Sequence, residues 1–183
     1  MLLPRIGMIA LLAALVVSTA AGAAEDRCKQ LVDDKEYDRA IGECSAMLAL
    51  PDYPAAEAYN NRGIAYAGKG QYDKAVEDYS RAIDLDARFD KAYNNRGNAY
   101  WHLGNHAASL ADYQKAIEIN PRDPNAYYNL ACRYALRKNT TEACAWLQKA
   151  VLKGFTNWEH MKKDSDLDSI RGASCYTSIM KGK

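Results

Sequence analysis

The sequence repeats itself every 34 residues, and this period restricts the chain to a fold in which one small unit is stacked several times. Residues 59–63 read YNNRG, and residues 93–97 repeat them letter for letter. An aspartate–tyrosine pair, Asp78 and Tyr79, returns as Asp112 and Tyr113. No composition-based argument limits the fold as strongly as this period.

The residue types within the period predict pairs of antiparallel helices. Two helices approach closely only where side chains are small, and Gly63 and Ala75 supply such positions on either side of a turn. Gly70 and Gly104 lie where the chain must turn between the two helices. A single pair cannot bury its own apolar face, so the pairs must stack.

The pattern resembles the tetratricopeptide repeat (TPR), which combines aromatic and small residues at fixed offsets over 34 residues. The residues that carry the resemblance are Tyr59, Gly63, Tyr66, Ala75, Tyr79 and Ala82, then Tyr93, Gly97, Tyr100, Tyr113, Ala116 and Pro121, then Tyr127, Leu130, Ala131, Tyr134, Ala143, Leu147 and Ala150. Arg62 and Arg96 stand where the family usually has leucine, and we expect their stems to pack while their charged ends reach solvent.

The resemblance implies an all-α fold, a right-handed α-solenoid of antiparallel helix pairs with about four TPR hairpins. A solenoid needs a cap on its last hairpin, and the non-repeating tail resembles the capping helices of this family. The expected boundaries are a TPR solenoid over residues 25–154, with repeats near 25–54, 55–89, 90–123 and 124–154, and a C-terminal helical cap over 155–183.

The first 24 residues have the character of a secretory signal peptide. Arg5 is their only charge, an apolar run follows over residues 6–17, and small residues lead to an Ala-x-Ala exit near Ala23. The apolar run is short for a membrane-spanning anchor, the alternative interpretation, because a span needs about 20 residues. We therefore expect export, to a bacterial periplasm or beyond, with no membrane insertion after the signal is removed.

Charge and motif content argue against several classes of function. Without Arg5 the chain has 23 basic and 23 acidic residues, so it offers no basic field for nucleic acid. No phosphate-binding loop, nucleophile motif or metal-ligand spacing is present, and His102 and His106 are separated by the expected turn at Gly104. We expect no cofactor, no metal and no catalytic residues.

The family resemblance also implies a concave groove lined by the first helix of each hairpin. Asparagine amides suit an extended peptide backbone, and tryptophan is frequent at binding hot spots. Asn61 and Asn95 are expected to be structural. The candidate groove residues are Asn60, Ile64, Lys91, Asn94, Asn98, Trp101, His102 and Tyr128.

Five cysteines remain after the signal segment. By the resemblance, Cys28 takes the position of Gly63 and Cys44 that of Tyr79, which face each other in a TPR hairpin, so a Cys28–Cys44 disulfide is expected. Cys144 could pair with Cys175 if the last hairpin faces the tail, which would leave Cys132 free. The alternative is that all five are small core residues.

The function expected from the resemblance is binding of another polypeptide, as an adaptor in the cell envelope. Two alternatives remain open. One is a periplasmic helper that docks to an envelope enzyme and regulates it. The other is an enzyme with an unrecognised site, against which the lack of converging acid, base, nucleophile or metal ligands argues.

Overall fold

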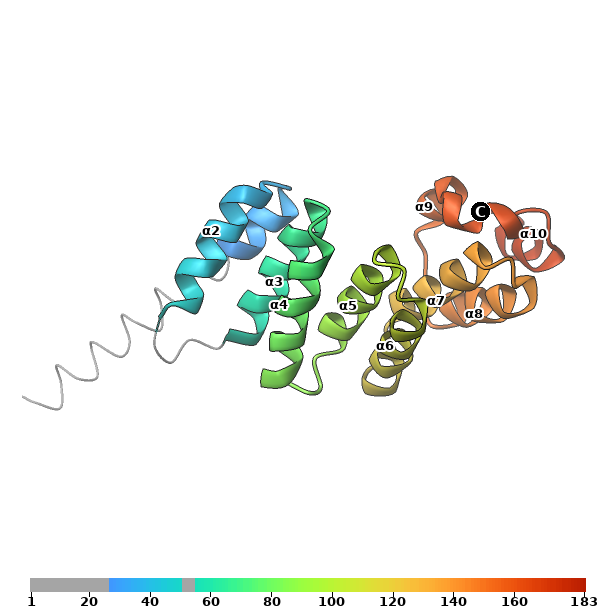
Figure 1. Ribbon diagram of the computed structural model, residues 1–183. Coiled ribbons are helices and arrows are strands. Elements are labelled where there is room, and N and C mark those ends of the chain that lie inside the picture. The colour runs from blue at the N-terminus through green and yellow to red at the C-terminus, as the bar shows by residue number, and fades with distance from the viewer. Residues whose placement is uncertain (1–26, 51–54) are drawn as a thin grey trace, which may run out of the picture. The chain divides into compact units, whose positions relative to one another are not determined.

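The computed structural model describes residues 27–50 and 55–183, and within them every regular element is helical. The expected signal peptide lies outside the described residues. Residues 27–33 are helical. The elements that follow are α2 (Tyr37–Leu48), α3 (Ala55–Gly68), α4 (Tyr72–Leu85), α5 (Asp90–His102), α6 (His106–Ile119), α7 (Pro124–Leu136), α8 (Thr140–Leu152), α9 (Trp158–Lys163), the 3-10 helix η1 (Ser165–Ile170) and α10 (Ser174–Met180) (Figure 1).

The helices form two compact units, residues 1–87 and residues 88–183. In the first unit, α3 packs against both α2 and α4. In the second, α5 pairs with α6 and α7 with α8, and α6 also contacts α7. The antiparallel pairs α3–α4, α5–α6 and α7–α8 are visible in Figure 1. The fold class expected from the sequence, stacked antiparallel helix pairs, is confirmed.

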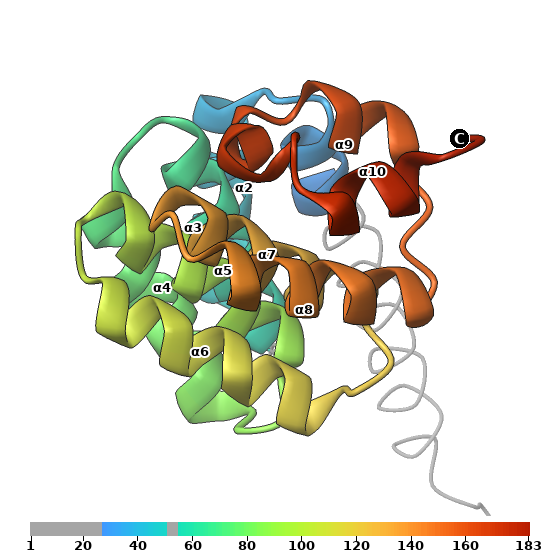
Figure 2. The same cartoon turned by 90° about the vertical axis from the view of Figure 1, so that its right-hand side faces the viewer.

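The tail continues the second unit rather than standing apart from it. The 3-10 helix η1 packs against α7, and α10 packs against α8. Figure 2 shows α9 and α10 along one side of the α7–α8 pair. Met161, Leu167 and Ile170 of the tail are fully buried in one apolar cluster with Leu147 of α8. The tail thus covers the apolar face that the last hairpin would otherwise expose.

The turn inside each hairpin is built the same way four times. One residue adopts a left-handed conformation at Lys35, Gly70, Gly104 and Lys138, with φ of 60°, 72°, 78° and 58°. The next backbone N–H donates to the carbonyl five residues earlier: Glu36 to Leu31, Gln71 to Tyr66, Asn105 to Tyr100 and Asn139 to Tyr134. This is the Schellman ending of a helix, which favours glycine at the left-handed position. The two middle turns have glycine there and the two outer turns have lysine.

A contact between two pairs of neighbouring residues closes each hairpin, and we call it the closing contact. In α3–α4 it joins Arg62 and Gly63 to Asp78 and Tyr79. The Arg62 guanidinium donates from Nε and Nη2 to the two carboxylate oxygens of Asp78, both at 2.7 Å. Beside it, the Tyr79 ring fills the space that a side chain at Gly63 would need, since a Cβ there would lie 2.6 Å from the ring.

The second unit repeats this contact in α5–α6. Arg96 donates to both oxygens of Asp112 at 2.8 and 2.9 Å, and a Cβ at Gly97 would lie 3.2 Å from the Tyr113 ring. Asp78 and Asp112 are buried. The hydrogen bond to its aspartate is the main reason that the pKa of each arginine lies above its ordinary value. The expectation that the arginine heads reach solvent is wrong, because a buried carboxylate on the facing helix binds each of them.

The outer hairpins carry other residues at the same positions. In the last hairpin the corresponding residues are the apolar Leu130, Ala131, Trp146 and Leu147, and Ala131 and Leu147 share one buried cluster. In the first hairpin Cys28 and Cys44 form a disulfide with a Cα–Cα distance of 5.3 Å, and Arg27 pairs with Glu43.

We predict that Lys138→Gly raises the free energy of unfolding by about 1 kcal/mol, because a non-glycine residue in the left-handed region costs about 1–2 kcal/mol, partly offset by the entropy of glycine in the unfolded chain. Urea denaturation measures the change. Lys153→Gly is the matched control, since Lys153 ends α8 with an ordinary φ of −84°. An equal gain in both variants would contradict the argument.

We also predict that Asp78→Leu lowers the free energy of unfolding by about 3 kcal/mol, because it leaves the Arg62 charge half-buried without its partner. The double variant Arg62→Leu/Asp78→Leu should lose clearly less, because an apolar pair can replace a buried ion pair. Additive losses in a double-mutant cycle would show that the two side chains do not act together.

Candidate functional site

The sequence-predicted groove residues that remain accessible lie on one face of α5. Lys91, Asn94, Asn98, Trp101 and His102 follow one another at helical spacing, and we call them the α5 face. Lys91 and His102 are exposed, and the other three are half-buried. This surface combines two amides, an indole and two basic side chains.

Internal hydrogen bonds fix the orientation of both amides. Asn94 Oδ1 accepts from Asn129 Nδ2 of α7 at 3.0 Å. Asn98 Oδ1 accepts from the buried Tyr113 hydroxyl at 2.6 Å. Burial is also the main reason that the pKa of Tyr113 is raised, so it remains a protonated donor. Each amide therefore uses its oxygen inside the protein.

The indole of Trp101 lies between two other side chains. The Arg133 guanidinium lies over the ring, 5.0 Å from its centroid, and the His106 ring lies 4.1 Å away at a tilt. Neighbouring His102 has a lowered pKa, first because of partial burial and then because of the positive charge of Arg133. Trp101 is thus held in place while part of its surface stays accessible.

Two candidates from the first unit are less accessible than expected. Asn60 is buried, so the prediction that it is exposed is wrong. α3 packs against α2 and α4, and Asn60 is one of the residues of α3 that become buried. Ile64 packs against the apolar cluster that includes Leu31 and Val32, so it serves the core of this unit. Asn61, expected to be structural, is buried as well.

Tyr128 is also buried, and the tail is what covers it. Its ring stacks on Phe155 with centroids 4.1 Å apart, and its hydroxyl donates to Asp164 Oδ2 at 2.7 Å. The free thiol of Cys132 lies one turn further along α7 and donates to the same oxygen at 3.6 Å. Tyr128 therefore cannot contact a partner while the tail is in place.

Asp164 joins several parts of the tail to α7. Besides the two donors from α7, His160 lies 3.5 Å from its Oδ2, and its Oδ1 caps η1 by accepting from the Asp166 backbone N–H. Burial is the main cause of the raised pKa of the Cys132 thiol, with the Asp164 charge second. Cys132 is consequently a protonated, unreactive thiol rather than a nucleophile.

Arg133 belongs to this site although nothing in the repeat pattern pointed to it. It is buried, its Nη2 donates to Asp166 Oδ2 at 2.7 Å, and its Nε has no protein partner. The ion pair connects the tail to the same guanidinium that lies over Trp101. A pair 33 residues apart, outside the repeat pattern, leaves no periodic signal from which it could have been predicted.

A disulfide between Cys144 of α8 and Cys175 of α10 joins the tail to the last hairpin, with a Cα–Cα distance of 5.8 Å. In the described part of the chain, no three histidine, cysteine or acidic side chains are placed to hold a metal ion. Among these same residues, no helix has both the length and the apolar character needed to cross a membrane.

Comparison with known families identifies the repeats. Models described as tetratricopeptide repeat match residues 90–123 and 112–145, and one described as TPR repeat matches residues 65–104. These matches show that residues 65–145 are made of tetratricopeptide repeats, the class that the helix pairs indicated. No curated protein matches the sequence.

Several solved structures have a similar fold. A crystal structure of MamA is 27% identical with a TM-score of 0.64, covering 78% of this chain and 80% of MamA. A second MamA structure gives 26% and 0.63, covering 79% and 76%. The second TPR of Spaghetti (RPAP3), bound to the HSP90 peptide SRMEEVD, is 29% identical with a TM-score of 0.51 and covers 55% of this chain and 92% of that one.

We predict that Asp166→Ala lowers the free energy of unfolding by about 2 kcal/mol, because Arg133 is left buried without its counter-ion. The loss stays below that of a fully buried pair because Asp166 itself is partly exposed. Asp168→Ala is the control. Its carboxylate pairs with Arg171 on the surface, where such pairs contribute less than about 1 kcal/mol. Thermal and urea unfolding compare the two variants, and equal losses would contradict a structural role for the Arg133 pair.

Proposed function

We propose that this chain is a protein-interaction module whose α5 face contacts a partner polypeptide. The observation that carries the proposal is the accessible row of amide, indole and basic side chains on the first helix of a repeat. Tetratricopeptide repeats serve as protein-binding scaffolds, and the similar RPAP3 repeat holds a peptide.

The oriented amides suggest how the partner is held. Because Asn94 and Asn98 already use their oxygens inside the protein, their Nδ2 groups are the atoms that can donate outward. Backbone carbonyls of an extended segment are matching acceptors. Trp101 offers a rigid apolar surface at low entropic cost, as hot-spot residues do. Fixing the side chains in advance lowers the cost of ordering them on binding.

The proposed location is the bacterial periplasm or the extracellular space. The signal-like start of the sequence and the two disulfides support it, because disulfides persist in oxidising compartments. A helper that docks to an envelope enzyme through the same face is the second candidate. An enzymatic role has the least support, since Cys132, the free thiol, is buried with a raised pKa.

We predict that Trp101→Ala weakens partner binding about tenfold or more, because truncating a hot-spot tryptophan commonly costs about 2 kcal/mol. A photo-crosslinking residue at Lys91 would capture the partner, and calorimetry with the purified partner would then give Kd. Trp101→Phe should keep part of the affinity.

Trp146→Ala is the matched control, because Trp146 is also half-buried but lies on α8. Equal affinity of the Trp101→Ala variant and the native protein, with native circular dichroism, would reject the α5 face. A captured partner that is an enzyme with altered turnover would favour the regulatory helper.

A further inference from the structure

We infer that the first hairpin becomes stably folded only when it is oxidised, because the Cys28–Cys44 disulfide takes the place of the glycine–tyrosine contact that closes the middle hairpins. The reduced chain would keep its other hairpins folded and leave this one open. The inference concerns the folding of the first unit and does not depend on the proposed partner or on the α5 face.

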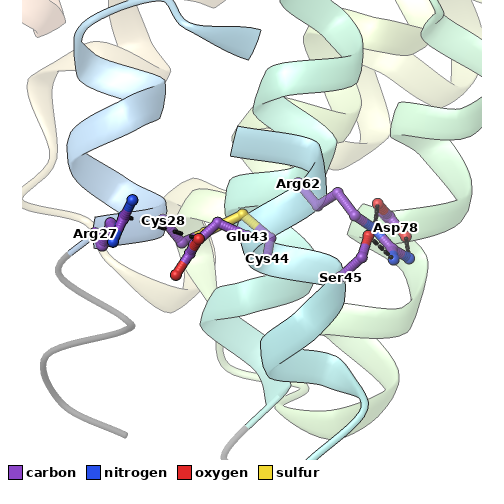
Figure 3. The surroundings of a disulfide bond; sticks show 7 residues. All are labelled: Arg27, Cys28, Glu43, Cys44, Ser45, Arg62 and Asp78. Carbon is purple, nitrogen blue, oxygen red and sulfur yellow. Dashed lines mark hydrogen bonds and ion pairs between the residues drawn. A yellow bond between two sulfur atoms is a disulfide. The ribbon is translucent and has the colours of Figure 1, made fainter. Parts of the chain in front are cut away.

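The positions of the two contacts correspond residue for residue. Cys28 and Cys44 are separated by 16 residues, the same spacing as Arg62 and Asp78. Arg27 and Glu43 directly precede the two cysteines, just as Arg62 precedes Gly63 and Asp78 precedes Tyr79. Figure 3 shows the disulfide beside the Arg27–Glu43 pair, with the Arg62–Asp78 pair of the next hairpin nearby.

The ion pair beside the disulfide is weaker than its counterpart. Arg27 Nε lies 3.8 Å from Glu43, with side chains 62% and 32% exposed, whereas Arg62 and Asp78 are 20% and 6% exposed and bonded at two points. An exposed pair at this distance is screened by water and adds little. The Arg27–Glu43 pair therefore does not replace the two-point Arg62–Asp78 contact in this hairpin.

The apolar packing around the disulfide is also thin. Among the described residues, both cysteines are fully buried in a cluster with Met47 alone, separate from the hairpin's other apolar cluster around Leu31 and Val32. In the next hairpin the buried Tyr79 ring fills the equivalent space. Two cysteine side chains fill less space than a tyrosine ring packed on a glycine. The reduced hairpin would therefore lack both the covalent bond and the ring packing that closes the middle hairpins.

Formation of this disulfide requires an oxidant. The chemical class of that oxidant is another disulfide, carried by a small molecule or by an oxidoreductase. One cysteine thiolate attacks a sulfur of that disulfide, forming a mixed disulfide and releasing one thiolate. The second cysteine thiolate then attacks the bound cysteine sulfur and displaces the other. Two electrons pass to the oxidant, which ends as two thiols carrying the two protons. Thiol–disulfide exchange is therefore the step that must precede the completed fold.

The test is hydrogen exchange on three forms of the full chain: the oxidised native protein, C28S/C44S and C28G/C44Y. The last variant places the glycine and tyrosine of the middle hairpins at the same positions. We expect about hundredfold faster exchange over residues 27–48 in C28S/C44S, from the loss of loop closure, and unchanged exchange in α4 and α6. In C28G/C44Y, protection should return and persist in dithiothreitol.

Native protection of residues 27–48 in C28S/C44S would overturn the inference. The inference would also be overturned if protection of residues 27–48 were lost in C28S/C44S and not regained at all in C28G/C44Y. The disulfide would then not be a substitute for the glycine–tyrosine contact. Native-like protection from exchange in α4 and α6 would show that the rest of the chain is folded. The α5 binding measurements are read separately, so either proposal can fail without the other.

Discussion

The contact that closes each helical hairpin is the interaction on which the rest of this protein depends. It joins two neighbouring residues on the first helix to two on the second, sixteen positions later. In the middle hairpins one position carries an ion pair, and the other lets the helices approach by setting a glycine against a tyrosine ring. The contact thus sets how closely the two helices of a hairpin approach, and a stacked fold is built from such hairpins.

The four versions of this contact show that geometry is kept while chemistry varies. The middle hairpins use an arginine–aspartate pair beside a glycine under a tyrosine. The last hairpin uses apolar residues, and its Leu130 and Leu147 are fully buried. The first uses a disulfide. The first and last hairpins depart most from the pattern of the middle two.

The repeat pattern allowed most of the fold to be predicted, because local spacing determines it. The 34-residue period, the turns at Gly70 and Gly104, and the facing positions of Cys28 and Cys44 were all readable in the sequence. The partners of Arg62 and Arg96 could also have been predicted, since Asp78 and Asp112 recur with the same period. The expectation that the arginines reach solvent did not take these aspartates into account.

Contacts outside the period could not be predicted in this way. The tail covers Tyr128 through Phe155 and Asp164, and it reaches Arg133 through Asp166. These residues have no counterparts 34 positions earlier. As a result the candidate surface is smaller than expected, and in the second unit it lies on the α5 face. Asp166 of the tail binds the guanidinium that lies over Trp101, so the cap and this surface share Arg133.

A transplant of the closing contact tests its role most directly. The variant R96L/G97A/D112W/Y113L gives the α5–α6 hairpin the residues of the last hairpin, and urea denaturation measures its stability. Our account predicts a free energy of unfolding within about 1 kcal/mol of the native protein. The half-transplants R96L/G97A and D112W/Y113L should each lose about 3 kcal/mol, because each leaves an unpaired charge and mismatched packing. A full transplant that loses the sum of the two halves would contradict the account.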